Sequence, residues 1–460
     1  MADLSCFKSY DIRGRLGTEM DQALAYKVGR GFARVLAPGM VVTGRDIRES
    51  SPGLQTALIQ GLRDEGVDVI DLGLCGTEEV YFATEHYGAG GGLMVTASHN
   101  PINYNGIKMV REGARPISGE TGLNAIRDLV AAGDFGPPRT QGALRRENPR
   151  DDYADRVVAY LDPVGLRPLK ILVNAGNGTA GPAFDAIAER LDAIDAPFAF
   201  VRLNHDPDSK FPNGIPNPLL PENQPQTADA VVAHGADMGV AWDGDFDRCF
   251  FFDEKGAFID GEYVVALLAR AFLDKEPGAR IVHDPRVMWN TVDVVTAGGG
   301  EPVVSRTGHA HLKARMREVD AVYGGEMSAH HYFRAFMYCD SGMIPWLLVA
   351  ELVARSGQPL SALVADMQAR FPSSGEINFA IEDKAAATAR FESAYLPQAR
   401  DSDRLDGISL DMGDWRVNLR ISNTENMLRL NVETRGDREL LAEKVEEISA
   451  LLRGDTAYTA

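Results

Sequence analysis

The sequence predicts an α/β protein of several domains, in which strands and helices alternate along most of the chain. Apolar strand-like runs and amphipathic helical runs follow one another from about residue 40 to about residue 325, which is typical of βα units around mostly parallel sheets. From about Ser374 onward, strand-like runs instead follow one another directly, which favours antiparallel pairing. The length of 460 residues is too great for one hydrophobic core and indicates about two to four domains.

The first segment alternates strands and helices up to a proline-rich boundary. Its predicted strands cover 41–42, 67–72 and 93–95, and its predicted helices cover 50–65 and 77–87. Thr77 stands where a helix cap is expected. Pro137-Pro138 and the charged run 145–152 indicate a domain boundary.

The second and third segments repeat this alternation. The second has predicted helices at 151–161 and from about 182, with strands at 170–173 and 238–242; the third has helices at 261–272, 288–296 and from about 309, with strands at 280–283, 302–305 and 322–323. The glycine-rich turn at 175–181 lacks the spacing of a nucleotide loop, so we interpret it as a tight strand-to-helix turn. The last segment has predicted strands at 377–381, 407–412, 415–421 and 427–433 and a closing helix at 437–453. We therefore expect domains at 1–147, 148–257, 258–371 and 372–460.

The composition narrows the class of protein and of partner. The net charge of -19 disfavours a nucleic-acid or anionic-membrane partner, and an anionic substrate would need a locally basic site. No run approaches the roughly 18 apolar residues of a membrane span, and the N-terminus has no signal-peptide pattern. The four scattered cysteines are typical of free thiols, so we expect a cytoplasmic protein.

A loop after the strand at 93–95 carries the first chemical motif, Thr-Ala-Ser98-His-Asn-Pro. Pro101 cannot join a strand ladder and favours an extended Asn100, so Ser98 should lie on a tight loop at the carboxyl end of a strand. Ligands of open α/β sheets bind at such strand ends. An isolated Ser-His pair would most simply be a surface turn, but the longer string continues with Tyr-Asn-Gly-Ile-Lys108.

The second motif is the acidic run Asp243-Gly-Asp245-Phe-Asp247-Arg248, directly after a buried strand. Side chains alternate along an extended segment, so the three aspartates fall on one face. Converging carboxylates select a hard cation, Mg²⁺ or Ca²⁺. An EF-hand loop is the closest rival, but it requires glycine where Arg248 stands, and the following Cys-Phe-Phe-Phe is strand-like. We predict a Mg²⁺ site.

Two further loops offer polar groups for a sugar phosphate. Glu326 and Ser328 lie two residues apart and suit adjacent sugar hydroxyls, while His330 and His331 titrate near neutral pH. For His331, a structural role is about equally expected. The run Arg420-Ile-Ser422-Asn-Thr joins two strand-like runs; its arginine can fork onto a phosphate, although Ser-Asn-Thr is also ordinary turn chemistry. Arg306-Thr-Gly-His-Ala and Asp284-Pro-Arg286 are weaker signals.

Together with Tyr10-Asp-Ile-Arg13-Gly, these motifs in this order resemble the α-D-phosphohexomutase family over essentially the whole chain, and the Glu-Met-Ser loop is similar to that of its bacterial phosphomannomutase members. One departure is visible: Asn426 stands where the family usually has proline. The resemblance implies a heart-shaped fold of three βα-rich mixed-sheet domains and a smaller α+β C-terminal domain. It implies reversible conversion of mannose 6-phosphate and mannose 1-phosphate through a phosphoserine enzyme, with glucose phosphates also accepted; phosphoglucomutase and phosphoglucosamine mutase are the alternatives.

The resemblance also implies the roles of individual residues. Ser98 would carry a phosphoryl group, Mg²⁺ would bridge it to Asp243, Asp245 and Asp247, and a hexose 1,6-bisphosphate would be both intermediate and activator. Arg248 would neutralise charge, and either Lys108 or His330 would be the acid/base, with neighbouring arginines lowering the pKa of Lys108. The expected substrate-binding residues are Tyr10, Arg13, His99, Asn100, Arg286, Thr307, Gly308, His309, Glu326, Ser328, Arg420, Ser422, Asn423 and Thr424. Partners would be small sugar phosphates, and the chain would be a monomer or a dimer. A serine hydrolase is excluded because adjacent Ser98 and His99 cannot form a triad and no nucleophile elbow is present.

Overall fold

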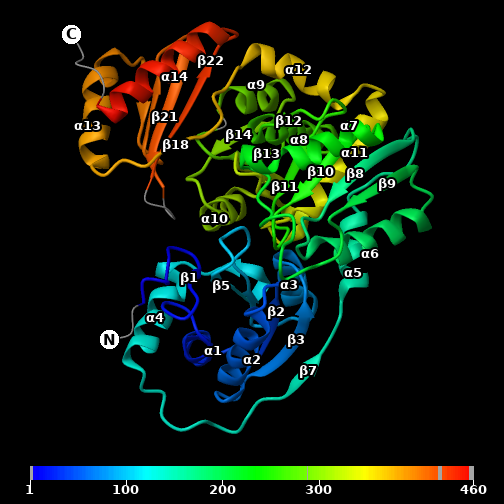
Figure 1. Ribbon diagram of the computed structural model, residues 1–460, viewed down its shortest axis with the longest axis vertical. Coiled ribbons are helices and arrows are strands. Elements are labelled where there is room, and N and C mark those ends of the chain that lie inside the picture. Colours follow the sequence, from blue (N-terminus) through cyan, green and yellow to red (C-terminus); the bar gives the residue numbers. More distant parts are fainter. Residues whose placement is uncertain (1–3, 287, 423–426, 455–460) are drawn as a thin grey trace.

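In the computed structural model, which describes residues 4–286, 288–422 and 427–454, the chain forms four β-sheets with helices packed against them (Figure 1). We call the parts built on these sheets units 1 to 4, with strands β1–β7, β8–β12, β13–β17 and β18–β22 respectively. Unit 1 (blue to cyan) and unit 4 (orange to red) lie at opposite ends of the view, and both face the α10 region of unit 3 (Figure 1). The predicted four-part α/β fold is confirmed.

Unit 1 contains a seven-stranded mixed sheet in the order β1-β5-β4-β2-β3-β7, with β6 paired to β5. The central strands β4, β2, β3 and β7 are parallel, as predicted, whereas β5 runs antiparallel between β1 and β4. The predicted boundary run contributes β7 to this sheet. The elements are β1 Ile12–Arg15, α1 Gln22–Leu36, β2 Met40–Arg45, α2 Ser51–Arg63, β3 Asp68–Leu74, α3 Thr77–His86, β4 Gly91–Val95, β5 Tyr104–Arg111, β6 Arg115–Pro116, α4 Asn124–Ala132 and β7 Leu144–Arg146.

Units 2 and 3 each contain a five-stranded sheet whose first strands are parallel and whose last strands form hairpins. Unit 2 has α5 Arg150–Val158, β8 Leu169–Asn174, α6 Ala180–Ala193, β9 Phe198–Leu203, α7 Pro225–His234, β10 Met238–Trp242, β11 Cys249–Phe252 and β12 Phe258–Ile259. Unit 3 has α8 Gly261–Lys275, β13 Arg280–His283, α9 Trp289–Ala297, β14 Glu301–Val304, α10 His309–Val319, β15 Tyr323–Gly325, β16 His331–Phe333, β17 Cys339–Asp340, α11 Met343–Ser356 and α12 Leu360–Arg370.

Unit 4 is an antiparallel sheet in the order β18-β22-β21-β20-β19 with two helices. Its elements are β18 Ile377–Phe379, α13 Lys384–Tyr395, β19 Asp401–Asp403, β20 Ile408–Asp411, β21 Trp415–Ile421, β22 Leu428–Thr434 and α14 Arg438–Arg453. The predicted α+β class and antiparallel pairing are confirmed. The sequence patterns did not identify α13 or the edge strand β19.

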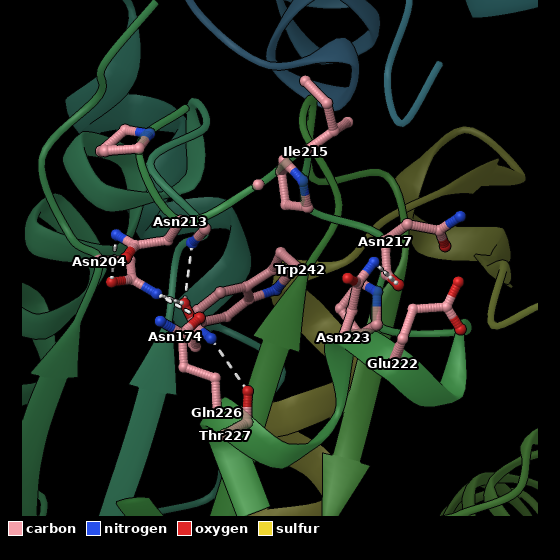
Figure 2. Close-up of a pocket in the computed structure, with 15 residues that line it drawn as sticks. Asn174, Asn204, Asn213, Ile215, Asn217, Glu222, Asn223, Gln226, Thr227 and Trp242 are labelled. Atoms are coloured by element: carbon pink, nitrogen blue, oxygen red, sulfur yellow. Dashed lines mark hydrogen bonds between the residues drawn. The ribbon is translucent and has the colours of Figure 1, made fainter. Parts of the chain in front are cut away.

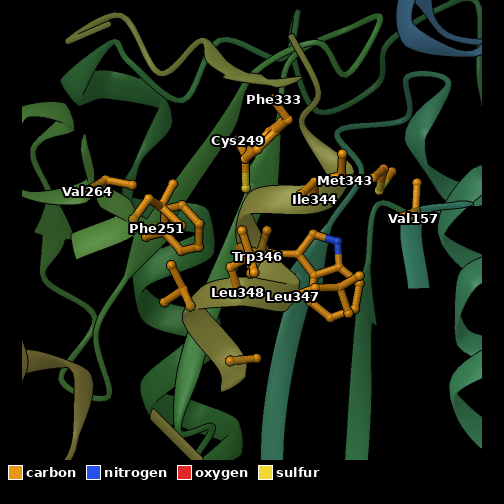
Figure 3. Packing of buried hydrophobic residues seen from close by; sticks show 14 of the residues in the cluster. Val157, Cys249, Phe251, Val264, Phe333, Met343, Ile344, Trp346, Leu347 and Leu348 are labelled. Carbon is orange, nitrogen blue, oxygen red and sulfur yellow. The ribbon is translucent and has the colours of Figure 1, made fainter. Parts of the chain in front are cut away.

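Units 2 and 3 share one hydrophobic core, whereas unit 4 has its own. Helix α11 contributes Trp346, Leu347 and Leu348 to the shared core, which also contains Phe251 of unit 2 and Phe333 of unit 3 (Figure 3). Because α11 is apolar on nearly every side, it has no polar face to mark it in the sequence. Among the described helices, none by itself is long and apolar enough to cross a membrane; one pair, Met343–Ser356 with Leu360–Arg370, passes such a test together but is bent by 98°.

Candidate active site

Ser98 lies in the loop that follows β4, at the carboxyl edge of the unit 1 sheet. Its backbone is left-handed, with φ of 48°, and its side chain is buried. Its amide donates to Thr96 Oγ1 at 2.9 Å, and its hydroxyl donates to Asp243 Oδ2 of unit 2 at 2.6 Å. The predicted tight loop is therefore present, and it delivers the Ser98 hydroxyl to the acidic run of another unit.

Arg48, which the sequence analysis did not identify, holds this loop from behind. Its guanidinium donates to four backbone carbonyls of the loop, those of Ser98 at 2.9 Å, Asn100 at 2.5 Å, Pro101 at 2.9 Å and Tyr104 at 3.2 Å. Arg48 is fully buried and lies 3.5 Å from the Asp46 carboxylate. Asp46 and Arg48 directly follow strand β2. Because ligands bind at the carboxyl ends of strands, this position is the signal by which the sequence could have identified them as site residues.

The three aspartates of the acidic run converge between β10 and β11. Carboxylate oxygens of Asp243, Asp245 and Asp247 lie within 4.8 Å of one another, and all three residues are buried. Asp243 is bound by Arg248 through Nε at 2.9 Å and Nη2 at 2.7 Å. Burial and the neighbouring Asp245 raise the pKa of Asp247, because a third negative charge is unfavourable in so small a space.

This acid cluster fits a hard divalent cation. Oδ1 of Asp245 is buried and has no hydrogen-bond partner among the described residues. A buried carboxylate oxygen without a donor is costly, and oxygen donors are the ligands that Mg²⁺ takes in proteins. The donor set of three carboxylates therefore supports the predicted metal site.

Lys108 and Thr77 both point from unit 1 into the acid cluster. Lys108 Nζ lies 2.7 Å from Asp245 Oδ2 and also bonds Asp247, while the Thr77 hydroxyl donates to Asp245 at 2.6 Å. The expectation that Thr77 caps a helix is wrong, because α3 begins at Thr77 and its N-cap is Gly76. Burial by itself lowers the pKa of Lys108, but Asp245, Asp247 and Asp243 raise it above its usual value. The prediction that arginines lower this pKa is wrong, because the acids are closer.

His99, Asn100 and Arg13 surround Ser98 on the unit 1 side. His99 Nδ1 lies 3.0 Å from Ser98 Oγ and also contacts Arg248, and Asn100 accepts from Arg13 at 2.7 Å. Burial and the positive charge of Arg248 lower the pKa of His99 to about 3. His99 is therefore neutral near pH 7 and can accept or donate a hydrogen bond without adding charge.

His330 of unit 3 faces the acid cluster from the opposite side. An Asp247 oxygen, a His330 nitrogen and an Asp340 oxygen lie within 4.8 Å of one another, and His330 Nδ1 lies 3.1 Å from Asp340 Oδ2. Asp340 is in turn paired with the fully buried Lys313 at 2.6 Å. Burial lowers the pKa of His330, but Asp247 and Asp340 raise it above its usual value. Its neighbour His331 is buried against the Tyr323 hydroxyl at 2.7 Å, which favours the structural role for His331.

Glu326, Ser328 and Arg286 lie together beyond β15 and β13. Glu326 accepts the Gly308 amide at 2.8 Å and the Tyr332 hydroxyl at 2.5 Å. Arg286 Nη2 lies 3.7 Å from Glu326 Oε1 and 3.5 Å from Ser328 Oγ. The buried Glu326 carboxylate is thus held in one orientation, and Ser328 is partly accessible beside it.

Tyr10 of unit 1 meets the loop 307–309 of unit 3. Its hydroxyl bonds His311 Nε2 at 2.7 Å, and its ring lies edge-on to His309 at 5.5 Å. Gly308 has φ of 118°, a backbone conformation that residues with a side chain rarely adopt, so glycine suits this position. Burial and Lys313 lower the pKa of His309 to about 3. The Thr307 amide donates to Asp406 of unit 4 at 3.1 Å.

Arg420 is the second-last residue of β21 in unit 4, and it contacts the same carboxylate as Arg286 of unit 3. Its Nη2 lies 3.0 Å from Glu376 Oε2, and Arg286 of unit 3 donates to the same oxygen at 2.8 Å. Ser422 is buried and its amide donates to the Met427 carbonyl at 2.9 Å. Asn423, Thr424 and Asn426 lie outside the described residues. The described predicted residues thus come from loops of all four units, joined by contacts between neighbouring units.

A separate cavity of about 400 Å³ lies in unit 2 beneath the loop 212–218. Its wall is built by amides: Asn204 donates to Asn174 at 3.1 Å and to Gln226 at 2.9 Å, and Asn213 donates to Asn204 at 2.9 Å (Figure 2). Phe211, directly before this loop, lies with its ring 5.8 Å from the Arg48 guanidinium. The amide network therefore holds in place a segment that contacts Arg48, the residue that holds the Ser98 loop.

Comparisons with known proteins cover the whole chain. Family models described as phosphoglucomutase/phosphomannomutase match it in four pieces: α/β/α domain I at residues 5–137, domain II at 151–256, domain III at 260–371 and the C-terminal domain at 376–451. A phosphomannomutase from Salmonella montevideo is 58% identical, covering 98% of this chain and 100% of that protein. A protein described as phosphohexose mutases, from Xanthomonas campestris, is 57% identical over 98% of this chain and 100% of its own length. The crystal structure of a phosphoglucomutase/phosphomannomutase family protein from Burkholderia thailandensis has a TM-score of 0.87 at 31% identity, covering 100% of this chain and 99% of that one.

Proposed function

Because this chain belongs to the α-D-phosphohexomutase family, we propose that it is a phosphomannomutase that converts mannose 6-phosphate and mannose 1-phosphate into each other through a phosphorylated Ser98. This proposal rests on one observation: the Ser98 hydroxyl and the Lys108 ammonium of unit 1 lie beside the aspartates of unit 2. The Ser98 hydroxyl lies 2.6 Å from Asp243, and Lys108 lies 2.7 Å from Asp245. A hydroxyl, a set of converging carboxylates and a buried cation are the parts that phosphoryl transfer needs.

Asp243, Asp245 and Asp247 would hold Mg²⁺ beside Ser98. Bound there, the ion would neutralise the equatorial oxygens of the phosphoryl group during transfer. Arg248, bound to Asp243 at 2.7 Å, adds a fixed positive charge on the same side. His99 remains neutral and bonds the Ser98 hydroxyl, and Arg13 and Asn100 complete this wall of the site.

The transfer breaks the bond between phosphorus and Ser98 Oγ, which leaves with the electron pair and takes up a proton to become a hydroxyl, while a sugar hydroxyl oxygen bonds to phosphorus and loses its proton. The hydroxyl proton passes to a base, and we assign this role to His330, because Asp340 orients its ring and its pKa is raised. Lys108 keeps its proton among the acids and acts as a fixed cation or as the acid of the reverse step. The hexose 1,6-bisphosphate then turns over and returns its other phosphoryl group to Ser98; the same compound would re-phosphorylate an enzyme that has lost the group.

Glu326 and Ser328 would hold sugar hydroxyls, with Arg286, Thr307, Gly308, His309 and Tyr10 around them. Arg420, Ser422, Asn423 and Thr424 would hold the phosphate that does not react. Galactose differs from mannose at C2 and C4, whereas glucose differs from mannose only at C2. Because the intermediate turns between the two transfers, useful contacts are those that form in both orientations, and we expect them to be contacts to the C3 and C4 hydroxyls. Mannose and glucose share these two hydroxyls, so we expect the phosphates of both sugars to be substrates.

Sugar phosphates are the proposed partners. The four cysteines, all within the described residues, are buried and form no disulfide, which supports a reducing compartment such as the cytoplasm. The experiment that tests the function is turnover of mannose, glucose and glucosamine 1-phosphates by the purified protein with Mg²⁺. Ser98→Ala should lose the phosphorylated mass of the intact protein and at least about two orders of magnitude in rate. Wild-type turnover in this variant would contradict the phosphoserine role, and preference for glucosamine 1-phosphate would favour phosphoglucosamine mutase.

A further inference from the structure

The first turn of α3 in unit 1 contacts the acidic run of unit 2 at two consecutive residues, Asp245 and Phe246. The Thr77 amide donates to the Asp245 carbonyl at 3.1 Å, and the Thr77 hydroxyl donates to the Asp245 carboxylate at 2.6 Å. The first N–H groups of a helix have no partner within the helix itself. The Asp245 carbonyl therefore completes the start of α3, and Thr77 binds both the backbone and the side chain of Asp245.

Phe246 is buried against the residue that precedes Thr77. Its backbone is left-handed, with φ of 47°, a conformation that is uncommon for a residue with a bulky side chain. A Cβ on Gly76 would lie 2.0 Å from Phe246 Cε1, so glycine leaves the room that this ring occupies. Uncommon backbone conformations persist where the surrounding contacts fix them. The start of α3 therefore helps to hold the turn that brings Asp245 and Asp247 together.

The two carboxylate oxygens of Asp245 have different surroundings. Oδ2 accepts from the Thr77 hydroxyl at 2.6 Å and lies 2.7 Å from Lys108 Nζ. Oδ1 is buried and has no hydrogen-bond partner in the described part of the chain. Because Thr77 and Lys108 occupy Oδ2, Oδ1 is the oxygen that remains for a cation in the acid cluster.

Thr77 orients Asp245 in a way that Lys108 does not. The Lys108 ammonium also bonds Asp247, and its positive charge repels a cation bound beside it. The Thr77 hydroxyl is neutral, so it orients the carboxylate without reducing the attraction of Asp245 for a cation. Thr77 is fully buried, and a β-branched side chain has few rotamers, so this donor is held in one place.

We propose that Thr77 is a positioning residue of the metal site, which holds Asp245 Oδ2 and so keeps Oδ1 as the oxygen for the cation. This inference rests on the proposed function, because the cation is the Mg²⁺ proposed there. Residues that hydrogen-bond a metal ligand commonly change metal affinity by about ten- to a hundredfold when they are replaced. Thr77 and Ser98 both belong to unit 1, so the same unit would position a metal ligand and carry the phosphoryl group.

The test compares Thr77→Val and Thr77→Ser with Thr84→Val. Thr84 is a buried threonine of the same helix whose hydroxyl donates to the Val80 carbonyl at 2.7 Å, so its variant removes a buried hydroxyl from α3 away from the metal site. The dissociation constant of Mg²⁺ is measured by calorimetry on metal-free protein. Thr77→Val, which keeps the shape and loses the donor, should raise it by roughly ten- to a hundredfold. Thr77→Ser keeps the donor and should stay within about threefold of the wild type, and Thr84→Val should match the wild type.

A second readout separates positioning from a general loss of structure. The Mg²⁺ concentration that gives half of the maximal rate on mannose 1-phosphate should rise in Thr77→Val by the same factor as the dissociation constant. Saturating Mg²⁺ should then restore kcat to within about fivefold of the wild type, which it would not do for a damaged fold. Should Thr77→Val not fold, Thr77→Ala, which also lacks the hydroxyl, decides by the same criteria.

Failure of this inference can be told apart from failure of the proposed function. A Mg²⁺ dissociation constant in Thr77→Val within about twofold of the wild type would overturn the inference. A wild type that binds no divalent cation would overturn it as well, because Asp245 would then not be a ligand. If the wild type binds Mg²⁺ but turns over no hexose phosphate, the proposed function fails, and the dissociation constants of the variants still decide the role of Thr77.

Discussion

Replacing Arg48 should damage catalysis more than substrate binding, because Arg48 holds the backbone of the Ser98 loop and has no hydrogen bond to Glu326 or Ser328 in the described structure. In Arg48→Met, the four carbonyls that accept from the guanidinium, at 2.5–3.2 Å, lose their donors, and the buried Asp46 loses its cation. Each buried group left unpaired costs about 1–3 kcal/mol, and breaking a buried ion pair costs about 3–5 kcal/mol. These costs overlap, so we expect the free energy of unfolding to fall by about 3–5 kcal/mol.

Arg48→Lys separates stability from catalysis. A lysine ammonium has three donors and no fork, so it can restore only part of the four-carbonyl contact, and Ser98 would lose its left-handed geometry. A shift of about 1 Å in a reacting group can cost about a hundredfold in rate. We therefore expect kcat for mannose 1-phosphate to fall by at least about tenfold with KM changed by less than about threefold. Arg45→Met is the control, because among the described residues the Arg45 side chain has one hydrogen bond, to the Asp46 carbonyl at 3.3 Å. Wild-type kcat in a folded Arg48→Lys protein would refute the reasoning.

Four further predictions follow from the same structure. Asp245→Asn removes one charge from the metal cluster and should weaken Mg²⁺ binding and activity while leaving the melting temperature near that of the wild type; full activity after chelation would exclude a catalytic metal. Burial and Asp260 raise the pKa of Glu262 to about 8, so the folded chain keeps a proton that the unfolded chain releases above about pH 5. The free energy of unfolding should therefore fall as pH rises from about 5 to about 8. Glu262→Gln should abolish that slope and gain up to about 4 kcal/mol at pH 8 in denaturant unfolding, and an unchanged slope would assign it to other groups. Galactose 1-phosphate should be turned over at least about tenfold more slowly than mannose 1-phosphate, because a mismatched C4 hydroxyl leaves buried polar groups unpaired at about 1–3 kcal/mol each. Glu326→Ala should weaken the binding of mannose and glucose phosphates together. Small-angle scattering should show a more compact particle when a hexose bisphosphate is added, and superimposable profiles would argue against closure.

The sequence predicted the parts of the site that lie directly after strands. Ser98 and the three aspartates could be placed because the carboxyl ends of parallel strands share one edge of a sheet. Lys108 could be placed only by the resemblance, since its position depends on the register of β5, in which it lies opposite Met94. Thr77, read as a cap, donates to Asp245 across units at 2.6 Å, and no local pattern reveals such a partner.

The contacts that sequence patterns could not supply are those between distant segments. Arg48 bonds carbonyls about fifty residues away, and a backbone acceptor leaves no trace in side-chain chemistry. Glu376 gathers arginines from two units, and its role depends on the pairing of β21 with β22. The pKa of Lys108 was predicted in the wrong direction for the same reason: the arginine-rich sequence motifs are near in the chain, but the acids are nearer in space.

The distribution of cores indicates where the protein can move while the chemistry stays in place. Units 2 and 3 share a continuous apolar core, so the acid cluster and His330 keep their relation. Unit 4 has its own core and meets unit 3 largely through polar contacts, among them Arg286 with Glu376 at 2.8 Å and Thr307 with Asp406 at 3.1 Å. Polar contacts exchange with water at small net cost, whereas separating an apolar core exposes area at about 25 cal/mol per Å². Opening at the junction of units 3 and 4 is thus the least costly way to let a bisphosphate turn, and a phosphate bound at Arg420, as proposed above, would tie unit 4 to the closed state.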